Sequence, residues 1–315
     1  MDLASVVVPL VVLTLLLSGT TKGFLSAYNI YSDFQLIAIF IIIGLAQMSV
    51  LALGQMNLAV GAIGCLSTFA FGFTMQELHL PIVPVILITL LFGVLQGAFQ
   101  GFLVTRTRIN PFIISLALLS LYQGIAYVLT AGAPFSDLTA SFVAFGSAEF
   151  LGLPLSFYVS VVICILMYIL VRYRKIGKKL LACGANGTAA VYSGVNYKNT
   201  ALFGHCLSGL LAAVAAILQI SRYGSAQMVI GSDWMMTSFV VPILGGTLLS
   251  GGKVNVIGCF LGAVLMVVID NAIVLWGVST YATQLTVGII LLAAFEIDRI
   301  RKDMMQKSAA RSAEE

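Results

Sequence analysis

The 315-residue sequence is poor in charge: only 9% of its residues are Asp, Glu, Lys or Arg, whereas 60% are hydrophobic. Soluble domains carry about 25% charged residues, so an ordinary soluble domain is excluded. The two histidines and five cysteines are scattered and form no CxxC pair, which argues against a zinc site or a disulfide framework. The sequence also lacks a Walker A motif, a nucleophile elbow and a close carboxylate pair. We therefore expect no catalysis and no cofactor bound by this chain.

Long apolar runs are what the sequence has in abundance, and runs of about 20 residues indicate membrane-spanning helices. We predict an all-α integral membrane protein with about ten spans in a membrane domain at residues 1–298, followed by a tail at 299–315. The segment at 234–250 contains Pro242, Gly245 and Gly246 and is the candidate for a broken or re-entrant helix. The predicted segments are 4–19, 34–53, 57–75, 81–104, 112–130, 154–172, 200–220, 234–250, 254–277 and 279–298.

The basic residues predict the orientation of these spans, because Lys and Arg are enriched in cytoplasmic loops. Arg106, Arg108, the stretch 172–198 and the tail belong inside by this rule. The stretch 131–154 has acidic residues but no Lys or Arg and belongs outside. Ten alternating segments satisfy all of these assignments and place both termini in the cytoplasm. We see no convincing residue-level repeat, so an inverted relation between segments 2–5 and 7–10 is a hypothesis from topology alone.

One loop stands out, at residues 173–199. The stretch 172–198 holds six basic residues and no acidic residue. Its small and helix-tolerant residues favour one or two short helices along the membrane surface. A structured basic loop of this kind, with Lys178 and Lys179, is suited to contact with another cytoplasmic protein. The alternative is a loop that serves only as a topological anchor.

Few polar residues interrupt the spans. Asp270 and Asn271 are either the polar lining of a solute path or partners for a neighbouring helix. The neutral amides Asn57, Asn110 and Gln284 suit a hydroxyl-bearing solute, although amides also join helices to one another. A single membrane carboxylate gives little support to ion coupling. The spacing of Gly93, Gly97 and Gly101 predicts a close helix-packing face.

Several motifs together resemble the permease subunits of ATP-binding-cassette importers of the ribose/xylose/galactofuranose/autoinducer-2 class. The resemblance extends over about residues 34–300. The motifs are Gly54-Gln55-Met56-Asn57-Leu58-Ala59-Val60-Gly61, Asn110-Pro111-Phe112-Ile113, Gly184-x-Asn186 with Ala189 and Gly194, and Leu244-Gly245-Gly246-Thr247-x-Leu249-x-Gly251-Gly252. The last of these is the most specific.

This resemblance implies a bacterial inner-membrane permease of about ten spans that moves a monosaccharide or similar polyhydroxylated solute inward. It implies three kinds of partner: ATPase subunits that bind ATP and magnesium, a second permease chain, and an extracytoplasmic solute-binding protein. It also assigns coupling to the ATPase to Gly184, Asn186, Ala189 and Gly194, together with the basic Lys178 and Lys179, and a structural role to the glycine-rich motif. Nucleic acid is not an expected partner.

Differences from the family pattern concern charge. Asn57 stands where Asp is usual, and Met235-Met236-Thr237-Ser238 replaces a usual Glu-Leu-Asp-Ala. Such differences indicate either a solute other than ribose or a pair of unlike permeases. The alternatives from other classes are a stand-alone ion-coupled secondary transporter and a passive channel or scaffold.

Overall fold

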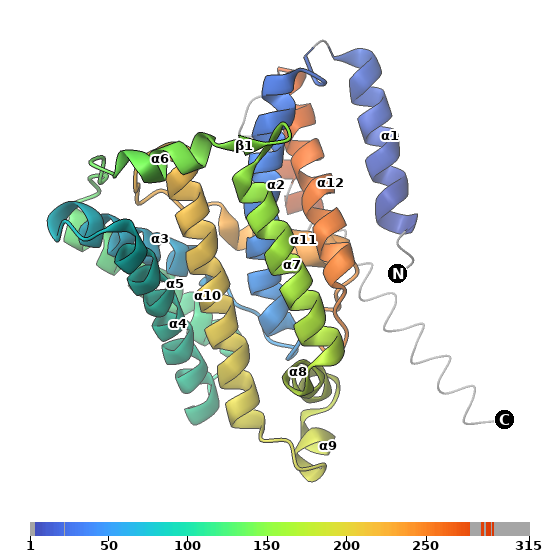
Figure 1. The fold of residues 1–315 in the computed structure, drawn as a ribbon. Coiled ribbons are helices and arrows are strands. Elements are labelled where there is room, and N and C mark those ends of the chain that lie inside the picture. Colours follow the sequence, from blue (N-terminus) through green and yellow to red (C-terminus); the bar gives the residue numbers. More distant parts are fainter. Residues whose placement is uncertain (1–3, 22, 278–284, 287, 291, 293–315) are drawn as a thin grey trace.

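The computed structural model describes residues 4–21, 23–277, 285, 286, 288–290 and 292, and the regular structure in them is almost all helical (Figure 1). One short antiparallel hairpin pairs β1 (Glu149–Phe150) with β2 (Leu153–Pro154). The predicted helical class is thus confirmed. The helices are α1 (Ala4–Thr20), α2 (Ala27–Leu51), α3 (Val60–Gly72), the π-helical turn η1 (Phe73–Glu77), α4 (Ile82–Arg106), α5 (Pro111–Thr130), α6 (Ala140–Ser147), α7 (Leu155–Tyr173), α8 (Lys175–Ala185), α9 (Gly187–Tyr192), α10 (Tyr197–Tyr223), α11 (Trp234–Leu244) and α12 (Val256–Leu275).

Helix α2 is the centre of the bundle. Residues 37–51 are all buried, and α7, α10, α11 and α12 all pack against the helix. A helix that is apolar on every side must be enclosed by other helices or by lipid, and α2 has 83% of its most apolar window inside the protein. The corresponding share is only 28% in α4 and α5 and 11% in α7, so these helices present apolar side chains outward, as lipid-facing helices do.

Six described helices are long and apolar enough to cross a membrane: α2, α4, α5, α7, α10 and α12. Helices α1 and α11 are apolar but shorter, and α3 has 13 residues before it passes into η1. The predicted segment 57–75 corresponds to α3 and η1, which are helical without a break from Val60 to Glu77, while residues 52–59 form a non-helical connection. The prediction that segment 234–250 is broken is confirmed, since α11 ends at Leu244. Most of segment 279–298 and the whole tail lie outside the described residues, and the number ten remains a prediction.

Helices α4 and α10 pack closely along the predicted glycine face. A Cβ atom on Gly97 would lie 2.2 Å from the carbonyl oxygen of His205, and one on Gly209 would lie 2.2 Å from that of Gly93. Only glycine permits this approach of two backbones. Because Gly93 meets Gly209 while Gly101 meets Leu202, the two helices run antiparallel. Arg106, at the end of α4, therefore lies at the same end of the bundle as the start of α10.

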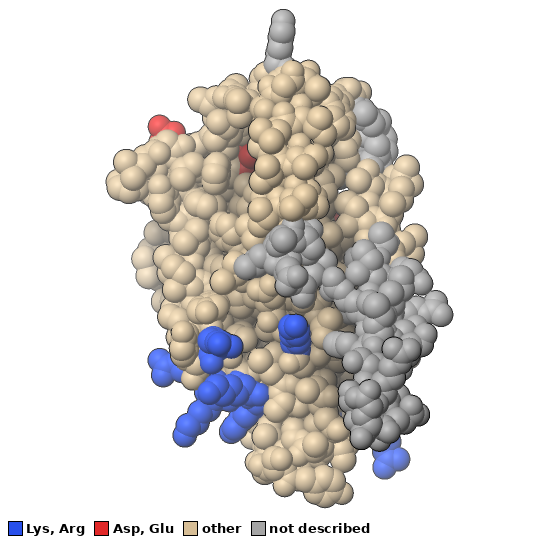
Figure 2. Space-filling view, turned by 90° about the vertical axis from the view of Figure 1, so that its right-hand side faces the viewer, with Lys and Arg blue, Asp and Glu red and all other residues tan. Residues whose placement is uncertain are grey.

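The two ends of the bundle differ in charge. Helices α8 and α9 lie at one end, and α6 and the hairpin at the other (Figure 1). Lys and Arg side chains gather near one end in Figure 2, whereas the visible acidic side chains lie toward the opposite end. Glu149 belongs to the hairpin, at the end away from α8. This separation agrees with the predicted inner and outer assignments of these loops.

Candidate functional site

Two connections between helices turn back into the bundle. The first, residues 52–59, follows α2, and the second, residues 224–233, follows α10. Each contains a left-handed glycine near the end of its long helix: Gly54 has φ +71° and Gly224 has φ +65°. The second connection reaches deep into the bundle, because its Met228 carbonyl accepts a hydrogen bond from Cys65 of α3 at 3.1 Å. Non-helical backbone at membrane depth is tolerated where protein covers it or a water-filled cavity adjoins it.

The two connections have the same spacing of residues. Gly54, Asn57 and Gly61 in the first correspond to Gly224, Gln227 and Gly231 in the second. A Cβ on Gly61 would lie 2.0 Å from the oxygen of Gly231, and a Cβ on Gly231 would lie 2.1 Å from the oxygen of Gly61. A reciprocal contact is what two inverted repeats produce at their interface. This shared spacing is a residue-level signal that sequence analysis missed.

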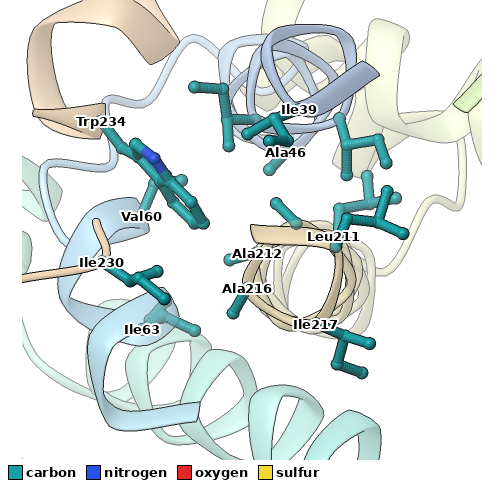
Figure 3. Close-up of a cluster of buried hydrophobic side chains, with 14 of the residues drawn as sticks. Ile39, Ala46, Val60, Ile63, Leu211, Ala212, Ala216, Ile217, Ile230 and Trp234 are labelled. Carbon is teal, nitrogen blue, oxygen red and sulfur yellow. The ribbon is translucent and has the colours of Figure 1, made fainter. Parts of the chain in front are cut away.

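Around this contact lies the main apolar core. Figure 3 shows side chains from α2, α3 and α10 converging beside Ile230 and Trp234 of the second connection and α11. The ring of Trp234 lies against Gly64, where a Cβ would come within 2.5 Å of it. The core therefore fixes the starts of both short helices, α3 and α11, against each other inside the bundle.

Asn57 is fully engaged in the first connection. Its Nδ2 donates to Ser208 Oγ of α10 at 3.1 Å, and its Oδ1 accepts from Gln100 Nε2 of α4 at 2.9 Å and from Ala59 N at 2.9 Å. The Gln47 amide satisfies the backbone of Asn57, with Nε2 donating to its oxygen at 2.8 Å and Oε1 accepting from its nitrogen at 3.2 Å. A buried amide bonded in this way fixes the backbone around it.

Gln55, two residues earlier, joins the same connection to α10 at two points. Its Nε2 donates to the hydroxyl of Tyr197 at 3.0 Å, and its Oε1 lies 2.8 Å from His205 Nε2. Since an amide oxygen only accepts, His205 Nε2 carries the proton and Nδ1 is the bare nitrogen. That Nδ1 is buried without a hydrogen-bond partner among the described residues. The sequence shows His205 only as one of two scattered histidines.

A second carboxylate, Asp233, lies near the predicted Asp270. Asp233 immediately precedes α11 and Asp270 lies on α12, and these two helices pack against each other. At 1.5 Å per helical residue, Asp233 lies about 15–18 Å along α11 from Gly245, and Asp270 lies about as far along α12 from Gly258. Because Gly245 and Gly258 are in contact, the two carboxylates share a level well inside the bundle. Asp233 and Ser232 are exposed on the single chain. Exposed polar residues at this depth face water or protein rather than lipid.

The predicted cytoplasmic loop forms two short helices, α8 and α9, as expected. Gly177, Leu180 and Cys183 are buried on one face of α8, whereas Lys178 and Lys179 are exposed. Burial raises the pKa of the Cys183 thiol, so it packs as a small apolar group. Between α8, α9 and the start of α10 lies an open groove of about 880 Å³, lined by Cys183, Gly187, Thr188, Val191, Tyr192, Val195, Asn196, Tyr197 and Lys198.

Three predicted coupling residues shape these two helices. Asn186 begins α9, where its side chain accepts a hydrogen bond from the backbone N–H of Ala189 at 3.0 Å. This is the usual role of Asn at a helix start, and it fixes the angle between α8 and α9. Gly194 has φ +82°, a conformation that favours glycine, and it lets the chain turn from α9 toward α10.

Gly184, at the end of α8, touches the first connection directly. A Cβ on Gly184 would lie 2.0 Å from the carbonyl oxygen of Ala52 and 2.7 Å from the backbone nitrogen of Gly252. Gly252 N in turn donates to Ala52 O at 3.2 Å, and a Cβ on Gly251 would lie 2.4 Å from Gly54 N. Two sets of residues predicted separately, the coupling residues and the glycine-rich motif, thus meet at residues 52–54.

The remainder of the glycine-rich motif packs α11 against α12. A Cβ on Gly245 would lie 2.2 Å from the carbonyl carbon of Gly258, and Gly246 has φ +84°. The Thr247 hydroxyl accepts from Asn255 N at 3.3 Å, and the Asn255 side chain caps α12 by accepting from Gly258 N at 3.0 Å. The predicted structural role of this motif agrees with these contacts.

Other predicted path residues lie elsewhere. Asn110 is exposed and caps α5, with Oδ1 accepting from Phe112 N at 2.9 Å. Asn271 donates to the carboxylate of Asp33 on α2, so it joins helices rather than facing Asp270. Gln284 lies outside the described residues. No group of three or more His, Cys, Asp or Glu side chains that could hold a metal ion occurs in the described part of the chain.

Comparison with known proteins gives one family. Residues 30–295 match the family model for the permease component of the branched-chain amino acid transport system. The chain is 31% identical to the ribose import permease protein RbsC of Haemophilus influenzae, over 92% of this chain and 91% of that protein. It is 30% identical to RbsC of Bacillus subtilis, covering 92% and 90% of the two chains. It is 32% identical to the autoinducer 2 import system permease protein LsrD of an Enterobacter species, covering 90% and 88%.

Two solved structures share the fold. One is described as an inward-facing ABC transporter of the metal-chelate type, with a TM-score of 0.55 and 14% identity over 95% of this chain and 98% of that chain. The other is PsaBC from Streptococcus pneumoniae in complex with Fab, with a TM-score of 0.52 and 15% identity over 84% and 90%. At such low identity they support the architecture and nothing finer.

Proposed function

This chain belongs to the family of transport-system permease components, and we propose that it carries a monosaccharide or similar polyhydroxylated solute into the cell. The observation that supports the solute class is the end-to-end match to permeases named for ribose and autoinducer 2 import. The same match favours a permease subunit over a stand-alone ion-coupled carrier. Its sequence has no nucleotide-binding motif, so ATP and magnesium belong to a partner ATPase.

The coupling of that ATPase to the permease would occur at α8 and α9. The stretch 172–198 has six basic residues and no acidic one, and Lys178 and Lys179 project from the exposed face of α8. Gly184 packs the same helix against the backbone of the first connection, so a displacement of α8 reaches the bundle interior. In this arrangement the chain spans the bacterial inner membrane. Helices α8 and α9 and both termini lie on its cytoplasmic side.

The solute path runs beside the second connection. Asp233 and Asp270 supply carboxylate oxygens that accept hydrogen bonds from hydroxyl groups, at a level where lipid contact is unfavourable. Asn57 shapes the path by fixing the first connection, and Asn271 by holding α12 to α2. A second permease chain covers the exposed polar surface at Asp233, and a solute-binding protein delivers solute at the outer end.

A charge reversal tests the docking surface. The double variant Lys178→Glu with Lys179→Glu is expected to lose co-purification with the ATPase, since both lysines are exposed and their reversal leaves the α8 core intact. The matched control reverses Arg106 and Arg108, two exposed basic residues on the other inner loop. Equal ATPase recovery with both double variants would refute docking at α8.

Transport is tested with purified permease, ATPase and binding protein in liposomes. We expect solute uptake only when all three components and ATP are present. Replacing residues 180–195 with a Gly/Ser linker should leave insertion intact while uncoupling ATP hydrolysis from solute movement. Uptake by the permease alone under an ion gradient would instead favour the secondary transporter.

A further inference from the structure

The side-chain hydrogen bonds of Gln55 connect the first connection to α10, the helix that follows α8 and α9. Tyr197 is the first residue of α10 and directly follows the turn after α9, where it lines the cytoplasmic groove. Its hydroxyl accepts from Gln55, and Gln55 also bonds His205, eight residues further along α10. Eight residues are about 2.2 helical turns, so the two partners lie about 80° apart around α10 and about 12 Å apart along it, and Gln55 bonds both from one side.

We propose that Gln55 is a positioning residue that makes residues 52–59 move with the first turns of α10. This inference rests on the proposed function. Helix α9 leads into α10 through Gly194, so displacement of the α8 and α9 pair displaces Tyr197 first. Because Gln55 holds Tyr197 and His205 together, the connection follows α10, and Asn57, bonded to Ser208 of α10, moves as well.

Because Gln55 and His205 are buried, the arrangement in which they are hydrogen-bonded is favoured over one in which they are apart. Gln55 has 7% of its surface exposed and His205 none, so an amide that loses its partners finds little water to replace them. His205 already has one nitrogen without a partner, and rotation away from Gln55 would leave both without one. The connection therefore stays attached to α10 while α10 moves.

The experiment uses the complete complex of this permease with its ATPase and binding protein in liposomes. Tyr197→Phe removes only the hydroxyl, and Gln55→Met removes both hydrogen bonds with little change of shape. Tyr168→Phe is the matched control, since Tyr168 lies on α7, away from the groove, and is 36% exposed. We measure solute uptake, ATP hydrolysis and thermal stability of the assembled complex for each variant.

We expect solute transported per ATP to fall about fivefold with Tyr197→Phe, the factor that corresponds to one net hydrogen bond, while ATP hydrolysis stays within twofold of wild type. Gln55→Met should fall further. The double variant should match Gln55→Met alone, because both changes remove the same bond. Tyr168→Phe should behave as wild type.

Two results would overturn the proposal. One is unchanged transport per ATP in Tyr197→Phe and Gln55→Met. The other is a parallel loss of transport, hydrolysis and thermal stability, which is the behaviour of a purely structural bond. Failure of the proposed function is distinct from both, because the wild-type complex itself would then show no ATP-dependent uptake.

Discussion

Replacing Gly184 with alanine is the sharpest test of the junction between α8 and the bundle. The added Cβ would lie 2.0 Å from Ala52 O, whereas ordinary contact begins at 3.4 Å. The end of α8 must therefore shift by the difference, about 1.4 Å, or the 52–54 turn must open. Either movement also strains the hydrogen bond from Gly252 N to Ala52 O.

The energetic cost follows from these contacts. Overpacking costs about 1–3 kcal/mol and the weakened hydrogen bond about 1 kcal/mol. Alanine recovers about 1 kcal/mol because it favours a helix more than glycine does. The net destabilisation of the junction is thus about 1–3 kcal/mol. A change of about 1–3 kcal/mol shifts an equilibrium by about 5- to 150-fold, and we expect a loss of ATP-coupled uptake of that size.

The assay compares Gly184→Ala with Gly187→Ala in the reconstituted complex. A Cβ on Gly187 would meet only the ring of Tyr197, with Cε2 at 3.5 Å and Cδ2 at 3.8 Å, so that variant adds the same methyl group to the neighbouring helix without a clash. Uptake, ATP hydrolysis and thermal unfolding are measured for both. If Gly184→Ala keeps the uptake and stability of Gly187→Ala, then α8 is not packed on the first connection as described.

Three further outcomes are expected. Gly97→Ala should lower the thermal stability of the purified permease by about 1–3 kcal/mol, because its Cβ would meet His205 O at 2.2 Å. Gly124→Ala, whose Cβ would have nothing within 4 Å, should be neutral or slightly stabilising. Equal stability of the two variants would contradict the glycine face. Asn57→Leu should lower the free energy of unfolding by about 2–4 kcal/mol, since Ser208 and Gln100 lose their buried partner. Asn110→Leu should lower it by about 1 kcal/mol, the usual value of a helix cap. Asp233→Asn should reduce solute-dependent uptake at least tenfold without loss of ATPase association, and unchanged uptake would remove Asp233 from the path.

The long helices were predictable from the sequence because lipid demands long apolar runs. Predicted limits for α4, α5, α7 and α12 lie within a few residues of the observed ends. For the predicted segment 57–75 the sequence did not show that the helix begins only at Val60 or that its last turn, η1, is π-helical, since the residues form one apolar run. The break at α11 was visible in advance because Pro242, Gly245 and Gly246 fall together.

The candidate site was predictable in its parts but not in its assembly. Cap residues such as Asn186 act within a few positions of themselves, so the sequence around them is informative. Contacts between distant segments, such as Gly184 with Ala52, depend on packing that no local pattern contains. Asp233 escaped notice for a related reason: it stands at the edge of an apolar segment, and only the fold brings it near Asp270.

The first connection brings three separate influences to one short stretch of backbone. Helix α8 contacts Ala52 through Gly184, the 250–252 turn contacts Gly54, and α10 holds Gln55 and Asn57 by side-chain hydrogen bonds. The first two contacts join backbone to backbone without side chains between them, and close-packed backbones transmit displacement rather than absorb it. Under the proposed function, a motor that moves α8 would also move the start of α3 and, through the reciprocal contact of Gly61 with Gly231, the connection that carries Asp233. Movement of the proposed docking helices and rearrangement beside the proposed solute path would then belong to one mechanical unit.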